Sequence, residues 1–300
     1  MPDPFPSSAP PIIDIRRVTR KFDNNMALDD VTLSVPRGGV FGLIGGNGAG
    51  KTTLIKHVLG MLKAQSGTVQ VFGLDPVQNP VGTLGRIGYL SEDRDLPNWM
   101  RVGELMRYTQ AFFPSWDEAY AEELRVAFDL DNNAKVKTLS RGQRARTGLL
   151  VALAHRPELL ILDEPSSGLD PVVRRDILGA IIRTIAEEGR TVFFSSHLLD
   201  EVERVADRVA IIHQGRIMLT ASMDELKETH RRVTLRFNQS LDRAPLLVGT
   251  LSCAGEGPEW TYVCRGESEQ LKRAAEAIGA TVVGDASLTL DEIFVSRIQA

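Results

Sequence analysis

The chain has 300 residues, enough for about two domains at roughly 150 residues each. Hydrophobic residues make up 43% of it and charged residues 25%, a globular mixture that excludes a fibrous chain and a wholly disordered one. The net charge of −4 argues against non-specific nucleic-acid binding, which depends on clustered positive charge. The longest purely apolar run, 149–154, is far shorter than the ~20 residues of a membrane span, so we expect none.

Residues 1–11 are rich in proline and lack the basic patch and apolar stretch of a secretory signal. We expect a flexible, polyproline-like tail there and a cytoplasmic location for the chain. The two cysteines, Cys253 and Cys264, do not form a CxxC pair. We expect reduced thiols that are buried or half-buried, with a disulfide across a hairpin as the alternative.

The first hundred residues have the pattern of an α/β unit. A nearly continuous apolar run at 40–44 is followed at once by the glycine-rich segment 45–50 and then by helical spacing from Lys51. Strand, glycine loop and helix in this order begin an α/β fold. A turn is expected at 23–25. Strands are expected at 12–18, 31–35, 40–44, 66–72 and 86–90.

From about 100 to 155, apolar residues recur every three or four positions, which predicts a helical insert over about 95–155. Continuously apolar segments then return, and such strands are buried on both faces, which favours a parallel sheet. These strands are expected at 159–163, 191–195 and 208–213, with helices near 171–188 and 198–206.

The remaining residues predict a smaller unit. We place a linker near 220–231, strands at 233–237 and 261–265, and a helix over 269–278. The predicted organisation is therefore a tail (1–11), a main domain (12–220) and a small C-terminal α+β domain (221–300).

The segment GGNGAGKT, residues 45–52, matches the pattern GxxxxGK[ST]. Glycines let the backbone curl so that successive N–H groups point at phosphate oxygens, where a Cβ would obstruct. The N-terminus of the helix that follows also favours an anion. Lys51 would reach the β- and γ-phosphates of a nucleotide, and the Thr52 hydroxyl would bind Mg²⁺.

The apolar strand LLILD, residues 159–163, ends in Asp163 and is followed by Glu164. Acidic side chains at the end of a core strand are costly unless they meet a cation or a reacting group. Asp163 can hold Mg²⁺, and Glu164 can accept a proton from an attacking water. An isolated Asp-Glu pair is more often a helix N-cap, but the phosphate loop favours the catalytic interpretation.

A third motif, LSRGQ at residues 139–143, begins a predicted helix. Ser140 is a good N-cap residue. A helix N-terminus that begins with serine and glycine is also suited to an anion, so both interpretations stand.

Taken together, these motifs resemble the nucleotide-binding subunit of an ATP-binding cassette (ABC) transporter over about residues 12–220. The resemblance rests on GGNGAGKTT, an LSRGQ counterpart of the signature LSGGQ, LLILDEP, SGLD and SSH, in the family's order. It implies an α/β fold, a P-loop NTPase cassette of the ABC type with a mixed sheet core, an antiparallel β edge and a helical insert. The segment 106–117 and the small α+β C-terminal extension resemble an exporter-like bacterial subset.

The resemblance also implies catalytic roles. Glu164 would be the catalytic base, His197 the switch residue near the γ-phosphate, and Lys51 would stabilise charge on the phosphates. His197 directly follows the strand 191–195, which puts it at the carboxyl edge of the sheet, where ligands bind in α/β folds.

Binding roles follow in the same way. Phe22 would stack on adenine, Ser140 and Gly142 would contact ATP held by a second subunit, and Asp170 would communicate across that interface. The implied Mg²⁺ ligands are Thr52, Asp163 and Glu92. The implied ATP-binding residues are Phe22, Gly45, Asn47, Gly48, Ala49, Gly50, Lys51, Thr52, Thr53, Ser140, Gly142, Gln143 and Asp170.

The sequence departs from the family pattern at three positions. Gly46 replaces a usual proline, which should matter little. Arg141 replaces the first glycine of the signature and adds a cation, either near the second subunit's γ-phosphate or on the surface. Glu92 stands where a glutamine is usual, so it keeps an oxygen ligand but loses an amide donor. The alternative for Glu92 is a solvent-exposed position beside Arg94.

The sequence therefore predicts an ATP-hydrolysing subunit with ATP and Mg²⁺ as cofactors. It would dimerise around two Mg-ATP with a second ATP-binding subunit and power a separate membrane permease, as an exporter, with no nucleic-acid partner. It would be cytoplasmic, held on the inner face of the membrane by that permease. The alternatives are a soluble non-transport ABC ATPase, such as an iron–sulfur assembly factor, and a regulatory cassette that binds ATP without turnover.

Overall fold

The computed structural model describes residues 10–299. The expected tail therefore lies outside the described residues except for Pro10 and Pro11, which belong to no helix or strand. The chain forms two compact units, the first ending at Thr220 and the second beginning at Ala221, and each is described by itself. Among residues 10–299, no helix combines the length and the apolar character needed to span a membrane.

The first unit is built on a six-stranded sheet with the order β5-β6-β7-β3-β8-β9. The pairs β5–β6, β6–β7, β7–β3 and β3–β8 are parallel. Strands β3, β6 and β7 are buried along their whole length, which explains the apolar residues that run along them and confirms the predicted α/β core. The strands are β3 (Gly39–Ile44), β5 (Ile87–Leu90), β6 (Leu159–Asp163), β7 (Thr191–Ser196), β8 (Arg208–His213) and β9 (Arg216–Ser222).

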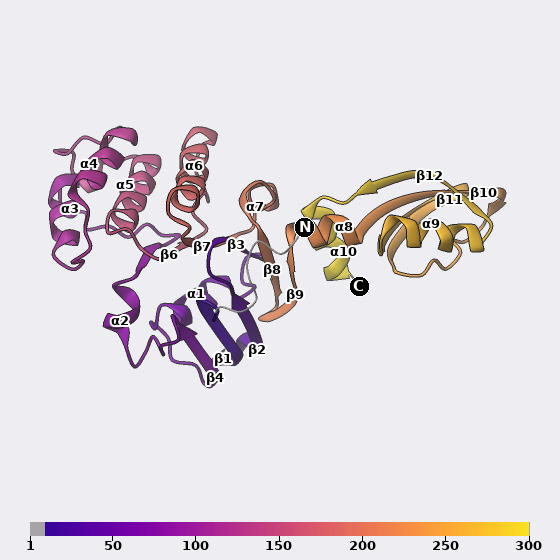
Figure 1. The fold of residues 1–300 in the computed structure, drawn as a ribbon, viewed down its shortest axis with the longest axis horizontal. Coiled ribbons are helices and arrows are strands. Elements are labelled where there is room, and N and C mark those ends of the chain that lie inside the picture. The colour runs from indigo at the N-terminus through magenta and orange to yellow at the C-terminus, as the bar shows by residue number, and fades with distance from the viewer. Residues whose placement is uncertain (1–9, 300) are drawn as a thin grey trace. The chain divides into compact units, whose positions relative to one another are not determined.

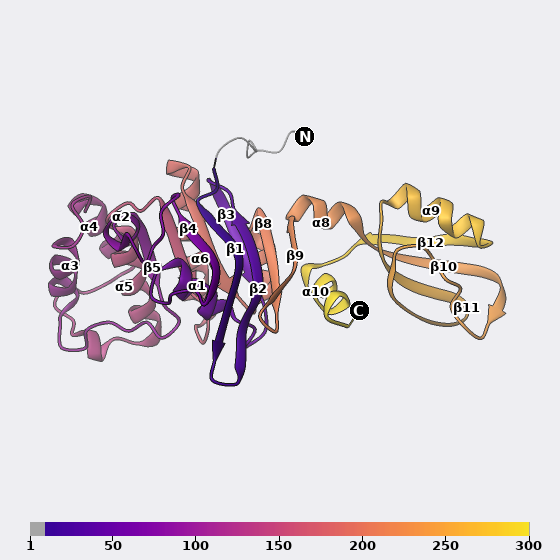
Figure 2. The same cartoon turned by 90° about the horizontal axis from the view of Figure 1, so that it is seen from below.

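A second, antiparallel sheet with the order β2-β1-β4 forms the predicted β edge. It consists of β1 (Ile13–Phe22), β2 (Asn25–Val35) and β4 (Ser66–Val71). Helix α1 (Lys51–Val58) packs between this sheet and the parallel one (Figures 1 and 2), and its Leu54 and Ile55 share one hydrophobic core with residues of both sheets. This core fixes the helix whose first residue is Lys51.

The predicted insert is helical. It contains α3 (Val102–Gln110), α4 (Glu118–Ala127) and α5 (Arg141–Leu153), which group together in Figure 1. A short helix α2 (Pro80–Leu84) precedes β5, and a 3₁₀ turn (Val136–Thr138) precedes α5. Two further helices, α6 (Pro171–Glu188) and α7 (Leu199–Val205), alternate with the last parallel strands.

The second unit has an antiparallel sheet of order β11-β10-β12, with α9 packed against it. Its core includes Leu235, Tyr262, Leu271 and Ala275. The elements are α8 (Met223–Thr229), β10 (His230–Leu241), β11 (Thr250–Arg265), α9 (Ser268–Ala277), β12 (Ala280–Ser287) and α10 (Leu290–Gln299).

The linker predicted near 220–231 is wrong. Strand β9 continues to Ser222, and helix α8 follows without a break. The Ser222 hydroxyl caps this helix by accepting a 3.1 Å hydrogen bond from the Glu225 backbone N–H. Met223 and Leu226 are buried, so the segment is amphipathic; its many charges hid this pattern.

Both cysteines are free thiols, as the sequence analysis favoured over a disulfide. Cys264 is buried, and burial raises the pKa of its thiol. Cys253 is exposed, contrary to the expectation that both would be at least half-buried, because it lies on the outward-facing part of β11.

Candidate active site

The phosphate loop connects β3 to α1, as its sequence requires. Gly50 is the N-cap of α1 and has a left-handed backbone with φ of 110°. A Cβ at this position would lie 2.6 Å from the backbone oxygen of Ala27. Only glycine therefore allows the loop to turn into the helix while packing against β2.

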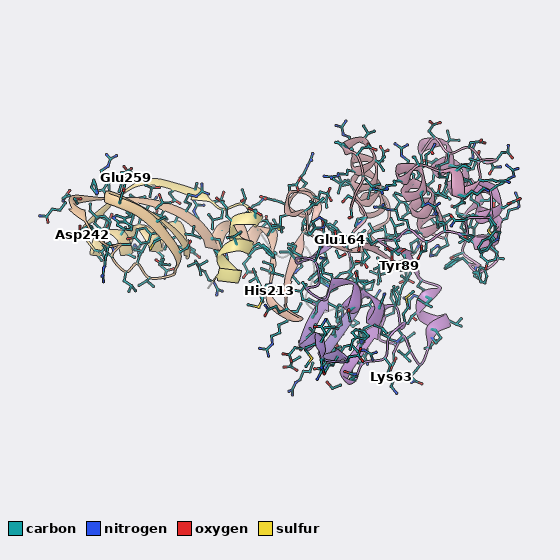
Figure 3. The ribbon with its side chains drawn as sticks, turned by 180° about the vertical axis from the view of Figure 1, so that it is seen from behind. Lys63, Tyr89, Glu164, His213, Asp242 and Glu259 are labelled. Atoms are coloured by element: carbon teal, nitrogen blue, oxygen red, sulfur yellow. The ribbon has the colours of Figure 1, made fainter. Side chains whose placement is uncertain are left out.

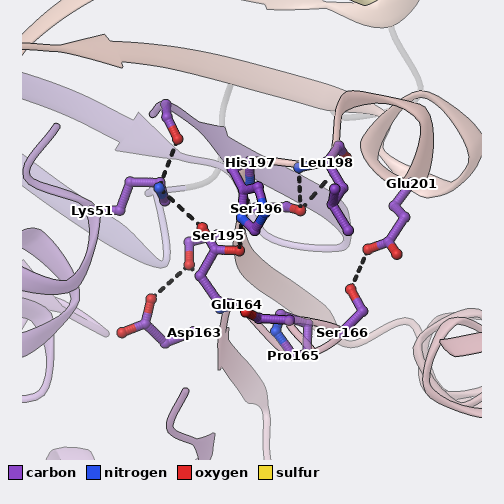
Figure 4. Close-up of polar contacts among 12 residues, drawn as sticks. Lys51, Asp163, Glu164, Pro165, Ser166, Ser195, Ser196, His197, Leu198 and Glu201 are labelled. Carbon is purple, nitrogen blue, oxygen red and sulfur yellow. Dashed lines mark hydrogen bonds and ion pairs between the residues drawn. The ribbon is translucent and has the colours of Figure 1, made fainter. Parts of the chain in front are cut away.

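Lys51 is the first residue of α1, and its side chain is 6% exposed. Its Nζ donates to the backbone oxygens of Gly45 at 2.6 Å and Gly46 at 3.1 Å. The same atom lies 2.9 Å from Oε1 of Glu164, as Figure 4 shows. The Lys51 ammonium is thus held at the loop and paired with Glu164, the residue that the sequence analysis expects to be the catalytic base.

Glu164 also reaches the residue after β7. His197 Nδ1 lies 2.7 Å from Glu164 Oε2 (Figure 4). The two residues meet because β6 and β7 are adjacent parallel strands, with Asp163 paired with Ser195, so their carboxyl ends lie at one edge. Glu164 itself has a left-handed backbone with φ of 47°, a conformation that non-glycine residues adopt at a cost.

Asp163 lies beside this pair and is 1% exposed. The Ser195 hydroxyl donates to Asp163 Oδ1 at 2.6 Å and accepts from the backbone N–H of Glu164 at 3.0 Å. Burial raises the pKa of Asp163, while its hydrogen bonds with Ser195 and Thr52 oppose that rise. The sequence analysis assigned no role to Ser195, although a serine ending the strand next to Asp-Glu was the available signal.

A cavity of about 350 Å³ lies over the phosphate loop, and most of the predicted ATP-binding residues line it. Asn25 and Ala27, which the sequence analysis did not single out, line it as well. Glu164 lies between the helical part of the unit and the antiparallel sheet (Figure 3). The lining residues are Phe22, Asn25, Ala27, Asn47, Gly48, Ala49, Gly50, Lys51, Thr52, Thr53, Glu92 and Glu164.

Glu92 faces this cavity. Burial, followed by repulsion from Glu164 and Asp163, raises the pKa of Glu92, and Lys51 partly opposes the rise. Arg94 is buried and donates to the backbone oxygens of Pro165 at 3.2 Å and Ser167 at 2.7 Å. Glu92 itself is exposed and lies in a turn, which agrees with the alternative interpretation of a solvent-exposed position beside Arg94, while its place in the cavity lining agrees with a role at the nucleotide.

Phe22 lines the same cavity and is 39% exposed. The Arg20 guanidinium carbon lies 4.6 Å from the centre of its ring. One face of the ring therefore has a cation–π partner within the chain.

The remaining predicted residues do not line the cavity over the loop. Ser140 caps α5 in a capping box with Gln143, whose backbone N–H donates to the Ser140 hydroxyl at 3.1 Å. Asp170 accepts from the backbone N–H groups of Val172 and Val173, at the start of α6. A Cβ on Gly142 would lie 2.7 Å from a Val173 methyl, so close packing of α5 and α6 requires glycine there.

Arg141 is the first residue of α5 and is exposed. It lines a second cavity of about 350 Å³, which Glu92 also lines. The two charged departures from the family pattern therefore share one cavity. Its full lining is Glu92, Asp93, Arg94, Arg141, Arg144, Ser167 and Gly168.

A glycine-rich loop followed by a lysine at the start of a helix, two carboxylates at the end of a core strand and a histidine just after the adjacent strand define a P-loop ATPase. Comparison with known proteins identifies the family. Residues 28–167 match the ABC transporter family, and the chain belongs to the ATP-binding proteins of ABC transporters. It is an ATP-binding ATPase of that family.

Individual relatives and a solved structure support the same family. The chain is 27% identical over 286 residues to the ABC transporter ATP-binding protein YtrB of Bacillus subtilis (strain 168), covering 95% of this chain and 98% of that protein. It is 33% identical to the bacitracin transport ATP-binding protein BcrA of Bacillus licheniformis, covering 74% of this chain and 73% of that protein. A solved ATP-binding subunit of an ABC transporter superposes with a TM-score of 0.66 at 27% identity, covering 72% of this chain and 92% of that one.

Proposed function

We propose that this chain hydrolyses ATP as one of two cassettes that close around two Mg-ATP and drive a separate membrane permease, which exports its cargo. The observation that carries the catalytic part is the Glu164 carboxylate, which contacts Lys51 of the phosphate loop with one oxygen and His197 with the other. The base, the phosphate-binding cation and the histidine thus meet at one point beside the loop.

Phosphate oxygens would compete with Glu164 Oε1 for the Lys51 ammonium, since both are anionic partners of the same Nζ. ATP binding would then release Glu164 from Lys51 and leave its carboxylate able to accept a proton from the attacking water. His197 Nδ1, 2.7 Å from Oε2 of Glu164, would keep that carboxylate oriented. Lys51 would meanwhile stabilise the charge on the transferring phosphoryl group.

The residues present fit a bound Mg²⁺. The buried carboxylate of Asp163, the Thr52 hydroxyl hydrogen-bonded to it and the Glu92 carboxylate are hard oxygen donors. Within residues 10–299, no group of three or more His, Cys, Asp or Glu side chains forms a metal site; Mg²⁺ usually takes only one or two protein carboxylates besides phosphate oxygens and water. When bound, it would neutralise charge on the phosphates.

Ser140, Gly142, Gln143 and Asp170 are proposed to contact ATP bound to a second cassette. Their positions at the starts of α5 and α6 support this, because backbone N–H groups at a helix N-terminus favour an anion. Arg141, beside them, would add positive charge to that contact.

Membrane attachment would come from the permease, which would hold the chain on the cytoplasmic face. The relatives named for ABC transport support the pairing, and the bacitracin transport proteins support export as the direction.

The test is reconstitution. The chain would be co-purified with the multi-span membrane protein encoded by an adjoining gene and placed in inverted vesicles. We expect the membrane protein to raise the ATPase activity of the chain, and bacitracin, the compound named for the relative BcrA, to accumulate inside the vesicles only with ATP. Activity that is unchanged by the membrane protein would contradict the pairing, and ATP-dependent accumulation only in right-side-out vesicles would contradict export.

A further inference from the structure

The loop after β6, residues 165–170, joins Glu164 to helix α6, and charged side chains from three different segments hold it. Arg94 donates to two of its backbone oxygens. Arg174, on α6, donates from Nε to the backbone oxygen of Leu169 at 3.2 Å. The third contact is the one between Ser166 and Glu201, and it lies furthest from solvent.

Ser166 is 1% exposed and Glu201 is 3% exposed. The Ser166 hydroxyl donates to Glu201 Oε2, a contact drawn in Figure 4. Burial raises the pKa of Glu201, and Arg174 and the Ser166 hydrogen bond oppose that rise, while Asp200 and Glu164 add to it. Arg174 Nη1 lies 3.7 Å from Glu201 Oε1. A carboxylate buried this deeply needs these partners.

The two ends of this contact belong to the segments that carry the proposed base and switch residue. Ser166 is two residues after Glu164, and Glu201 is four residues after His197 on α7. The segments are therefore joined twice: by Glu164 and His197 at the cavity, and by Ser166 and Glu201 behind it (Figure 4).

Glu164 needs such support because its backbone φ of 47° is unfavourable for a glutamate. A residue with a strained backbone keeps that conformation only when several surrounding contacts hold it in place. The Ser167 N–H, which donates to the Glu164 backbone oxygen at 3.1 Å, belongs to the same loop that Glu201 holds through Ser166.

We propose that Glu201 is a positioning residue for ATP hydrolysis, which acts through Ser166 to hold the strained Glu164 with its carboxylate against His197. The inference rests on the proposed roles of Glu164 and His197. It assigns to Glu201 an effect on the chemical step rather than on nucleotide binding, because neither Glu201 nor Ser166 lines the cavity over the phosphate loop.

The test uses the full chain in excess over Mg-ATP, at a protein concentration that binds all the nucleotide, and measures the rate of a single turnover per bound nucleotide, so that unfolded protein is not counted. Ser166→Ala removes the donor, and Glu201→Met removes the acceptor at nearly constant length. We expect each to slow the single turnover between about tenfold and about 100-fold, since small displacements of a reacting group have effects of that size. The Kd for a fluorescent ATP analogue should stay within about twofold.

Glu201→Gln keeps a carbonyl acceptor for the Ser166 hydroxyl and should recover most of the lost rate. Ser296→Ala is the matched control: Ser296 is also buried, donates one hydroxyl hydrogen bond to the Ile293 backbone oxygen and belongs to the second unit. It should leave the single turnover unchanged.

Single-turnover rates within twofold of the unmodified chain for both Ser166→Ala and Glu201→Met, with only the melting temperature lowered, would overturn the inference. If Glu201→Met does not fold, Ser166→Ala decides alone, because it removes only a hydroxyl. Glu164→Gln is run beside them: if it hydrolyses normally, the proposed role of Glu164 fails, whereas a blocked Glu164→Gln with normal rates for Ser166→Ala and Glu201→Met refutes the Glu201 inference alone.

Discussion

Ser195, at the end of β7, donates a 2.6 Å hydrogen bond across the sheet to Asp163 Oδ1. This bond opposes the rise in the pKa of Asp163 that burial causes. Without it, the protonated form of Asp163 should be favoured up to a higher pH, and a protonated carboxyl is a poor Mg²⁺ ligand.

Ser195→Ala should therefore move the acid limb of the pH profile of kcat/KM to higher pH, because activity needs ionised Asp163. The profile would be measured at fixed, subsaturating Mg²⁺, where ligand protonation limits the rate. Ser296→Ala serves as the matched control here too. If the acid limbs of Ser195→Ala and the unmodified chain coincide, Asp163 ionisation does not control this limb.

Glu164→Gln should reduce turnover by about 10²–10⁴-fold, since an amide of the same shape cannot take a proton. ATP binding should remain, because the base acts only in the chemical step. ATPase rate and the Kd of a fluorescent nucleotide analogue check the two parts separately.

Lys51→Ala is the contrasting variant. Its ammonium would contact phosphate before any bond breaks, so we expect its loss to weaken nucleotide binding itself. Hydrolysis at the normal rate by Glu164→Gln would remove Glu164 from the mechanism, whatever Lys51→Ala does.

The chain should be largely monomeric without nucleotide and should dimerise with ATP when Glu164→Gln blocks hydrolysis. The proposed contacts of Ser140 and Gly142 are made to phosphate, so they exist only when ATP is bound. Light scattering with and without Mg-ATP measures this. A stable dimer in the absence of ATP would mean that another surface holds the two copies together.

Glu92 should act at the metal. The pKa of Glu92 is raised, first by burial and then by Glu164 and Asp163. Bound Mg²⁺ would oppose that rise, because a cation favours the ionised carboxylate, which can then serve as an oxygen ligand.

We therefore expect Glu92→Gln to remain active with an altered Mg²⁺ dependence, and Glu92→Ala to lose more activity because it removes the oxygen. ATPase rates across a Mg²⁺ titration compare the three forms. Three superimposable curves would exclude a role for Glu92 at the metal.

From the sequence alone, the structure could be predicted wherever it depends on consecutive residues. The run 45–52 specifies its own loop and helix start, because glycine conformations and the helix N-terminus are properties of consecutive residues. The apolar runs of β3, β6 and β7 likewise identified buried parallel strands. The short helix α8 was missed because its many charges hid an amphipathic pattern that rests on only two buried residues, Met223 and Leu226.

Contacts between residues far apart in the chain were decided only by the tertiary structure. The sheet order puts β6 beside β7, and this alone brings Ser195 to Asp163 and His197 to Glu164. Glu201 contacts Ser166 because the face of α7 that carries Glu201 is turned inward. No spacing in the sequence encodes these distances, because they depend on the register and stacking of elements that fold together around a common core.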